Sequence, residues 1–409
     1  MTPSDDRSDE ARRGATLAAA GALALAAAVS LGLARFSYAL LLPPMRADLG
    51  WSYFTAGAMN TVNAAGYLIG ALLTARALAR FDARDLLLGG SVAIALMLAA
   101  HAFVSSDAAL FGLRLVSGVA SAVVFVAGGL LAARLAGTGT LDAGLVLGLY
   151  YGGTGVGIIA SALLLPPLTG RPVAHAWQAA WLALAAAALL ATAVMARGTR
   201  ELRTAPAASG DAKTVAPFHW RPFGFALAGY FMFGLGYIGY MTFIVTLLRE
   251  QGLADAQIVG FYTLLGAGVI ASSWLWVAPL QRYRGGQTLA LLNALLAFAT
   301  LLAVLSARPL AVFASGALFG SVFLSVVAST TALVRHNLPA PAWPGGIAAF
   351  TIVFAAGQIV GPSLVGWVAD GPGGLERGLA GSAALLAFGA LLAWQQRALP
   401  TKQVVQANS

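Results

Sequence analysis

The sequence of 409 residues contains no cysteine, so disulfide bonds, thiolate metal sites and cysteine nucleophiles are excluded. It contains four histidines, and no two of them have the spacing of a zinc-binding motif; they are His101, His175, His219 and His336. We therefore expect no metal site and no cofactor. The chain also lacks a recognisable nucleophile–base pair or phosphate-binding loop, which argues against an enzyme.

Charged residues are also scarce. They make up 10% of the chain, whereas a soluble domain carries about 25%. Hydrophobic residues make up 59%, and the mean hydropathy is +0.81. Because so few polar side chains cannot cover a surface that faces water, we expect a lipid bilayer to surround most of the protein. The net charge of +9 fits cytoplasmic loops rich in basic residues, so no nucleic-acid partner is expected.

Long apolar runs are abundant. A helix needs about 20 apolar residues to cross a membrane. Twelve runs qualify, at 15–42, 52–79, 86–104, 110–134, 143–168, 176–196, 222–248, 257–280, 287–306, 310–334, 344–369 and 376–395. The first is too long for a cleaved signal peptide, so we interpret it as a retained helix. The sequence thus predicts an all-α integral membrane protein of twelve transmembrane helices.

One long polar segment divides these helices six to six. We predict an N-terminal tail at 1–14, a six-helix bundle at 15–196, a cytoplasmic linker at 197–221, a second six-helix bundle at 222–396 and a C-terminal tail at 397–409. With both termini inside, 17 of the 24 lysines and arginines fall on the cytoplasmic side, 5 outside and 2 within helices. This asymmetry predicts a multi-pass protein of the cytoplasmic (inner) membrane with both termini in the cytoplasm.

The two halves also repeat. An offset of 202 residues aligns five pairs, namely Gly32 with Gly234, Tyr38 with Tyr240, Gly66 with Gly268, Arg80 with Arg282 and Gly118 with Gly320. This offset spans six predicted helices. Because six is an even number, both halves are expected to have the same orientation in the membrane. The pattern is a parallel repeat, typical of transporters in which two bundles rock against each other.

Four local motifs resemble the major facilitator superfamily. They are GALLTARALARFDARDLLL at 70–88, APLQRYRGGQTLALL at 278–292, RLVSGVASA at 114–122 and GQIVGPSLVG at 357–366. The stretches GLARFSYALLLPPMRADLGWS at 32–52 and NAAGYLIGALL at 63–73 resemble the uncharacterised YbfB/YjiJ-like branch. The resemblance covers nearly the whole chain and implies the fold and a transport function, without a defined substrate.

The first of these motifs departs from the superfamily pattern. Ala79 stands where the superfamily's loop has aspartate, and Asp82 stands where it has glycine. Arg80 and Arg84 remain, and Arg282 is in the weaker second copy. The resemblance implies that Arg80, Asp82, Arg84 and Arg282 act in conformational gating. The fifth helix lacks the Gly-Pro pair typical of proton-coupled drug exporters.

Two arginines, Arg35 and Arg114, lie inside predicted helices, whereas all fifteen acidic residues can be placed outside the hydrocarbon core. A charge at the bilayer centre costs about 2.5–3.5 kcal/mol on insertion scales, so such a residue usually has a function. Counted from the predicted outer ends of their helices, both lie at a depth of about 10–12 Å. A guanidinium binds a carboxylate or phosphate through two parallel hydrogen bonds. These two residues therefore predict a site for an anion. The alternatives are hydrogen bonding to backbone carbonyls and, for Arg35, extension to the interface.

Further polar residues share these helices or their repeat partners. Tyr38 is one turn from Arg35, and Tyr237 and Tyr240 have the same spacing on the seventh helix. Asn63 and Gln358 are polar residues in mid-helix. We predict a substrate-binding set of Arg35, Tyr38, Arg114, Tyr237, Tyr240, Asn63 and Gln358. Aromatic packing and hydrogen bonding between helices are the alternatives for the tyrosines and for the two amides.

The leading interpretation is a secondary transporter that moves a small organic anion, such as a monocarboxylate, by alternating access, acting as a monomer. One alternative is an exporter of hydrophobic or cationic compounds, which usually needs a carboxylate within the membrane. Asp370, near the outer end of the eleventh helix, is the candidate for such a group. A second alternative is a membrane sensor or scaffold without transport activity.

Overall fold

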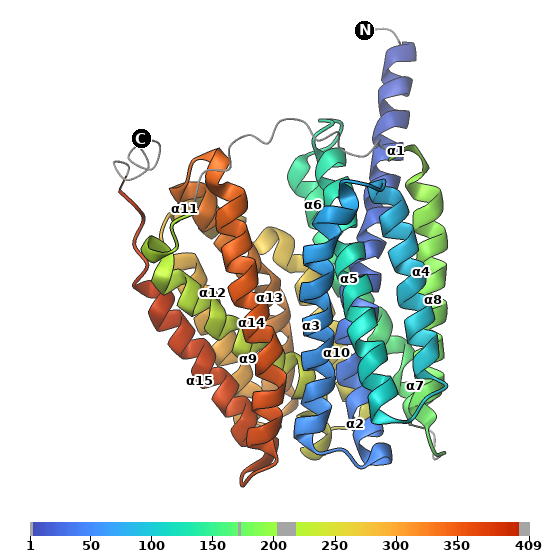
Figure 1. Cartoon of the computed structure of the whole chain (residues 1–409), viewed down its shortest axis with the longest axis vertical. Helices are drawn as coiled ribbons and strands as arrows, with labels where there is room; N and C mark the ends of the chain where they lie inside the picture. The colour runs from blue at the N-terminus through green and yellow to red at the C-terminus, as the bar shows by residue number, and fades with distance from the viewer. Residues whose placement is uncertain (1–2, 171–172, 203–217, 401–409) are drawn as a thin grey trace. The chain divides into compact units, whose positions relative to one another are not determined.

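The computed structural model describes residues 3–170, 173–202 and 218–400, and these residues form helices and no strand (Figure 1). Eleven helical segments of the described chain are long and apolar enough to cross a membrane. α3 (Tyr53–Leu78) has a comparable length of 26 residues and completes the predicted twelve. It is more polar than the others because it carries Asn60 and Asn63. The predicted all-α fold is confirmed.

The helices follow one another with short connections. The first half of the chain contains α1 (Pro3–Ala27), η1 (Ala28–Phe36), α2 (Tyr38–Leu49), α3, α4 (Ala83–His101), α5 (Asp107–Ala136), α6 (Ala143–Leu164), α7 (Pro166–Thr169) and α8 (Ala176–Gly198). The second half contains α9 (Gly224–Glu250), α10 (Asp255–Leu275), α11 (Val277–Arg282), α12 (Gln287–Leu305), α13 (Pro309–Asn337), α14 (Trp343–Ala369) and α15 (Gly374–Trp394). Three 3₁₀ turns, η2 (Arg200–Leu202), η3 (Arg221–Phe223) and η4 (Ala340–Ala342), lie between helices.

The first membrane helix contains a π-helical segment, η1, between α1 and α2. The N–H of Ser37 donates to the carbonyl of Gly32, five residues earlier, at 3.0 Å, and its hydroxyl donates to the carbonyl of Leu33 at 2.5 Å. Pro43 and Pro44, which have no N–H to donate, follow in α2. All nine residues of η1 are buried. π-Helical turns are frequent at functional sites, and this one contains Arg35.

The chain forms two compact units, and the first comprises residues 1–41 and 65–208. Within it α4 packs on α5 and α8, and α1 and η1 pack on α6. Figure 1 shows α4, α5 and α8 side by side. Glycines allow the closest contacts: a Cβ on Gly32 would lie 2.5 Å from the Cα of Gly157, so η1 and α6 touch through their backbones. The helix that carries Arg35 is therefore held tightly against its neighbour.

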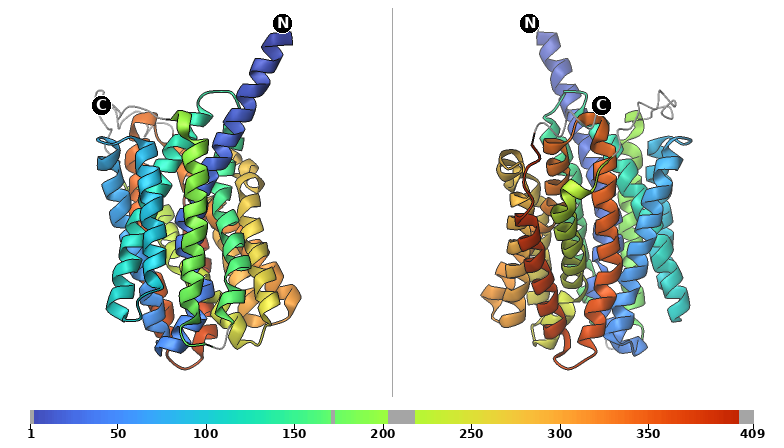
Figure 2. Two further views of the ribbon diagram at one scale, coloured as in Figure 1. Left: turned by 90° about the vertical axis from the view of Figure 1, so that its right-hand side faces the viewer. Right: turned by 60° about the vertical axis from the view of Figure 1, so that its left-hand side comes forward.

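The second unit comprises residues 42–64 and 209–409. Its centre is α9, which is buried along nearly its whole length and packs on α14 and α15. α10 packs on α13, and α12 packs on α13 and α15. Figure 2 shows α14 and α15, in orange and red, from a second direction. Residues 42–64, the end of α2 and the start of α3, belong to this unit although the remainder of α3 belongs to the first.

The internal repeat reappears in the packing of each unit. In the first unit a Cβ on Gly66 of α3 would meet the backbone of Leu115 of α5. In the second, a Cβ on Gly268 of α10 would lie 2.8 Å from the carbonyl oxygen of Ala317 of α13. Gly268 lies 202 residues after Gly66, and Ala317 lies 202 residues after Leu115, which is the offset of the sequence repeat. Equivalent glycines therefore make equivalent helix contacts in the two halves.

The predicted division into tails, bundles and linker stays a prediction. Residues 203–217 of the linker, 401–409 of the C-terminal tail and 1–2 of the N-terminal tail lie outside the described residues. Helix α1 begins at Pro3, so the predicted N-terminal tail is helical over the whole of its described part.

Candidate functional site

Arg35 is buried in the first unit, with 4% of its surface exposed. It lies near the end of η1, and its guanidinium carbon is 5.5 Å from the ring centre of Tyr67 on α3 and 6.0 Å from that of Phe36. Aromatic faces carry partial negative charge and attract cations at these distances. Tyr67 was not among the residues that the sequence singles out, because only the packing of α3 on η1 brings it there.

Arg114 is 1% exposed and lies in α5. Its guanidinium donates a hydrogen bond to the carbonyl of Ala34 at 3.0 Å, and its guanidinium carbon is 4.7 Å from the ring centre of Tyr38. The carbonyl contact that sequence analysis considers as an alternative is therefore present. It uses one of the five N–H donors of the guanidinium.

Arg35 and Arg114 are two positively charged side chains, and both are buried within the first unit. Ala34 joins them directly, because its carbonyl accepts from Arg114 while its chain neighbour is Arg35. Of the predicted substrate-binding residues, the first unit thus brings together Arg35, Tyr38 and Arg114.

A buried histidine lies beside this group. His101, the last residue of α4, is fully buried and stacks on Trp181 of α8 with ring centres 4.3 Å apart. Its Nδ1 is 2.7 Å from the carbonyl oxygen of Met97, so Nδ1 carries the proton. Sequence analysis counts His101 only as a histidine without a metal-site partner, because its neighbours come from other helices.

The other four predicted substrate-binding residues lie in the second unit. Tyr237 and Tyr240 are buried on α9. The Tyr240 hydroxyl is 2.7 Å from the Ser315 hydroxyl, which donates to the carbonyl of Ala299; the Tyr240 hydroxyl is therefore the donor in its own bond. Its ring stacks on Phe319 with centres 3.9 Å apart. These contacts are interhelical packing, which is the alternative that the sequence left open for Tyr240.

Tyr237 belongs to a column of stacked rings on α9, α13 and α14. Its ring centre is 4.6 Å from Phe233, 5.7 Å from Phe354 and 6.0 Å from Phe323, and the ring planes differ by 13–19°. Tyr230 extends the column, with its ring centre 5.0 Å from Phe354. Phe354 is only partly buried, so one ring of the column is accessible.

Asn63 and Gln358, on α3 and α14, are buried, with 1% and 4% of their surfaces exposed. Neighbouring polar residues on the same helices join α3 to α9 and α14: Asn60 donates to the Thr242 hydroxyl at 2.7 Å, and Thr61 donates to the carbonyl of Ile359 at 2.7 Å. The polar face of α3 in this unit is therefore an interhelical contact.

The four predicted gating residues have different surroundings. Arg84 donates to the carbonyl of Ala196 at 2.8 Å and to the Thr199 hydroxyl at 3.3 Å, which connects α4 to the end of α8. Asp82 caps α4 by accepting from the N–H of Arg84 at 2.7 Å. Arg80 and Arg282 are exposed, and Arg282 lies 5.7 Å from the ring centre of Tyr283.

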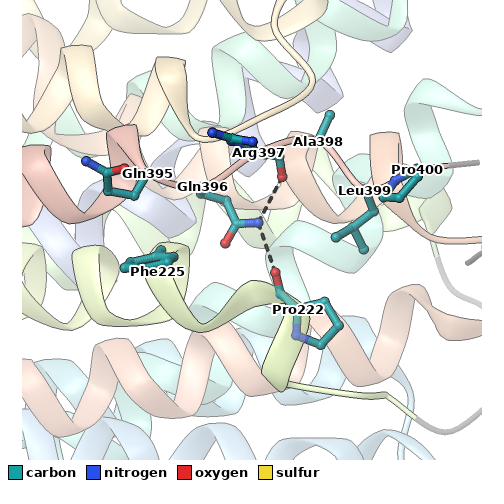
Figure 3. A pocket seen from close by; sticks show the side chains of 8 residues that line it. All are labelled: Pro222, Phe225, Gln395, Gln396, Arg397, Ala398, Leu399 and Pro400. Carbon is teal, nitrogen blue, oxygen red and sulfur yellow. Dashed lines mark hydrogen bonds between the residues drawn. The ribbon is translucent and has the colours of Figure 1, made fainter.

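The start of α9 and the end of α15 border an open hollow in the second unit, lined by residues 222, 225 and 395–400 (Figure 3). Its central residue is Gln396, which is 4% exposed and donates to the carbonyls of Pro222 and Arg397, both at 3.0 Å. Gln396 also accepts from the N–H of Ala226 at 3.2 Å. Because these bonds tie the ends of α9 and α15, we interpret the hollow as a consequence of helix anchoring.

Comparison with known proteins decides the class. The family described as "Uncharacterised MFS-type transporter YbfB" matches residues 27–394. The chain belongs to this family of the major facilitator superfamily. The resemblance seen in the motifs is thereby confirmed, and so is the fold of two six-helix bundles. The YbfB-type family supports a multi-pass membrane transporter rather than an enzyme. No curated protein matches the chain.

Solved structures agree on the fold of this YbfB-type protein. A bacterial homologue of the human lysosomal transporter Spinster, inward-facing and unoccupied, is 14% identical with a TM-score of 0.70, over 93% of this chain and 96% of that one. A mutant form of the nucleoside transporter NupG is 15% identical with a TM-score of 0.72, over 92% and 100%. Identities this low show the fold alone.

Proposed function

We propose that this YbfB-type protein is a secondary transporter that carries a small organic anion, such as a monocarboxylate, by alternating access. Arg35 and Arg114 are the anion-binding residues, and Tyr67 and Tyr38 hold their guanidinium groups. The remaining predicted residues, Tyr237, Tyr240, Asn63 and Gln358, are proposed to line the pathway within the second unit. The protein acts as a monomer in the cytoplasmic membrane with both termini in the cytoplasm.

The observation that supports this proposal is the burial of two neighbouring like charges. Two cations in a medium of low dielectric constant repel each other more strongly than in water. The contacts described above, a carbonyl and three aromatic faces, supply partial negative charges. A bound carboxylate adds a full negative charge and lowers the repulsion. Arginine suits this role because its planar fork matches a carboxylate in two parallel hydrogen bonds.

Ligand-dependent thermal stabilisation of the purified protein tests the proposal. A ligand that binds the folded state stabilises it by RT ln(1 + [L]/Kd), about 2.7 kcal/mol at a hundredfold excess over Kd. We expect organic acids in a panel to raise the unfolding temperature, and amides of the same acids to have no effect. Arg35→Gln should abolish both this stabilisation and uptake into proteoliposomes while the protein still folds. Unchanged uptake by Arg35→Gln would contradict the proposal.

The export of hydrophobic or cationic compounds is the second candidate. The aromatic column on α9, α13 and α14 supports it, because ring faces attract organic cations and stack on apolar rings. The same panel separates the two functions. Stabilisation by quaternary ammonium compounds, abolished by Tyr237→Ala and unaffected by Arg35→Gln, would favour export over anion transport.

A further inference from the structure

Five exposed arginines lie at one end of the second unit. They come from four segments, which stand before α9, around the end of α11, at the end of α13 and after α15, and they are Arg221, Arg282, Arg284, Arg335 and Arg397. These segments contain no aspartate and no glutamate over residues 218–225, 276–287, 335–345 and 394–400. The segments therefore carry charge of one sign, and they provide no carboxylate that could neutralise it.

Hydrogen bonds join these four segments to one another. Gln396, after α15, donates to the carbonyl of Pro222, before α9, at 3.0 Å (Figure 3). Asn337, the last residue of α13, donates to the carbonyl of Arg284 at 2.7 Å. The side-chain oxygen of Asn337 accepts from the N–H of Leu399, also at 2.7 Å. The backbone that carries the five arginines is thus one bonded framework, which fixes the positions of their Cα atoms relative to one another.

Three of the five arginines lie beside an aromatic ring. Their guanidinium carbons are 5.2–5.9 Å from the ring centres, and the pairs are Arg221 with Trp220, Arg282 with Tyr283 and Arg335 with Trp343. Trp220 is 61% exposed and Tyr283 is 40% exposed. In membrane proteins, tryptophan and tyrosine are enriched at the ends of transmembrane helices, at the level of the lipid head groups. The rings therefore indicate that these arginines lie at the depth of the head groups.

Charged segments elsewhere in the chain mix both signs. The connection between α3 and α4 in the first unit contains Asp82, and Asp85 follows in the first turn of α4. At the opposite end of the second unit, Arg249 forms an ion pair with Asp255 at 3.0 Å. An excess of basic residues is general for cytoplasmic loops. The complete lack of acidic residues distinguishes the four arginine-bearing segments from these two regions.

We propose that this end of the second unit binds anionic phospholipids, whose phosphate groups are held by the arginines. We define the arginine platform as Arg221, Arg282, Arg284, Arg335 and Arg397. A guanidinium binds the oxygens of a phosphodiester through two parallel hydrogen bonds. The negative surface of the cytoplasmic leaflet attracts each basic residue near it. The count of basic residues predicts that this end is cytoplasmic, so the platform is expected to meet that leaflet.

The exposed rings favour a lipid over a soluble phosphate compound. A soluble anion needs charge and hydrogen bonds, and it gains little from a neighbouring apolar ring. A lipid carries its phosphate next to glycerol and acyl chains, so it meets an arginine and a ring together. Trp394, at the end of α15, is 65% exposed, and Phe225, in the first turn of α9, is 53% exposed, which extends the apolar border. The inference goes beyond the proposed function, because it concerns one unit and no transported substrate.

The test is a titration of the purified full chain in detergent, followed by native mass spectrometry, with two lipids that have the same acyl chains. Phosphatidylglycerol is negatively charged, whereas phosphatidylcholine is neutral overall. We expect the first phosphatidylglycerol to bind about tenfold or more tightly than the first phosphatidylcholine. Arg282→Gln and Arg335→Gln should each raise the dissociation constant of phosphatidylglycerol about fivefold, and the double variant about twenty-five-fold. The binding of phosphatidylcholine should not change.

Two exposed arginines outside the platform are matched controls. Arg308→Gln, at the opposite end of α13, and Arg76→Gln, in the last turn of α3, should leave the affinity for phosphatidylglycerol unchanged. The unfolding temperature without added lipid shows whether each variant folds, and the single variants decide if the double variant does not.

Three results would each overturn the proposal. The first is equal binding of the two lipids by the unmodified protein. The second is an unmodified affinity for phosphatidylglycerol in the folded platform variants. The third is full competition by the water-soluble head group, glycerophosphoglycerol, at the concentration of the lipid, which would assign the platform to a soluble phosphodiester. We expect this head group not to compete, because it has no acyl chains to lie against the rings.

Discussion

At the scale of single residues, the positive site of the first unit depends on aromatic support. Arg35 reaches the face of Tyr67, and Arg114 reaches the face of Tyr38. Both guanidinium groups are therefore held by rings, and that of Arg114 also donates to the carbonyl of Ala34. Such support limits the orientations of a long side chain. The arginine is therefore already in its binding orientation when a ligand arrives, which lowers the entropy cost of binding.

This arrangement predicts a role for Tyr67 in anion affinity. Tyr67→Leu removes the ring face, and a cation–π contact contributes about 0.5–2 kcal/mol, so we expect the dissociation constant of the anion to rise by about two- to thirtyfold. Tyr67→Phe keeps the face and should bind the anion nearly as the unmodified protein does. Calorimetric titration of both variants measures the difference. Equal affinities of the two variants would show that the ring does not support Arg35.

The sequence could identify Arg35 and Arg114 but not their surroundings. A single charge within a long apolar run is visible without a structure, because burying it is costly. Tyr67 and the carbonyl of Ala34 reach these arginines only through the packing of α3, η1 and α5, which the apolar pattern does not determine. The bond between the Tyr240 hydroxyl and Ser315 was likewise not visible, because Ser315 lies on another helix.

At the scale of helices, glycines determine how closely the segments approach. Gly32 of η1 faces Gly157 of α6, and a Cβ on Gly32 would lie 2.5 Å from the Cα of Gly157. Overpacking a buried contact typically costs about 1–3 kcal/mol. We expect Gly32→Val to lower the unfolding temperature and to displace η1 together with Arg35. Thermal unfolding in detergent measures the change. Gly21→Ala on α1, where a Cβ meets nothing within 4 Å, should be neutral or stabilising.

The first turn of α4 has a structural role in addition to the gating that stays a prediction. Arg84 bonds to the carbonyl of Ala196 and to Thr199, and so it fastens α4 to the end of α8. Hydrogen bonds from a charged group contribute about 1.5–3 kcal/mol each, so Arg84→Gln should lower the free energy of unfolding by a similar amount. Arg80 is an exposed arginine in the loop before α4, and Arg80→Gln should have no effect on stability. Equal unfolding temperatures for both variants would contradict a structural role for Arg84.

The irregular segments could not be predicted from apolar runs. The first run was expected at 15–42, whereas the continuous helical segment that could span a membrane extends from Arg12 to Leu49. Pro43 and Pro44 lie inside α2, just beyond the expected end of the run. The π-helical turns of η1 leave no periodic signal in the sequence.

At the scale of the whole molecule, the repeat of 202 residues was visible because helix-packing glycines recur at fixed positions. Gly66 and Gly268 meet α5 and α13 at equivalent residues, so the alignment reflects contacts that both halves need. The membership of residues 42–64 in the second unit was not visible. It depends on Asp370, Thr242 and Ser363, which are distant in sequence and ordinary in type.

The distribution of basic residues makes the orientation of the molecule testable with a single helix. α5 has 30 residues and is therefore about 45 Å long, so its two ends must lie on opposite sides of a membrane. Ser106 precedes it and Thr138 follows it, and both are exposed. The excess of arginine and lysine in alternate loops predicts Ser106 outside and Thr138 in the cytoplasm.

A membrane-impermeant maleimide applied to intact cells should therefore label Ser106→Cys at once and Thr138→Cys only after permeabilisation. The absence of natural cysteines removes background labelling. The reverse pattern would invert the whole molecule, because every loop changes side together with α5. One pair of reporters on α5 therefore determines the side of every loop.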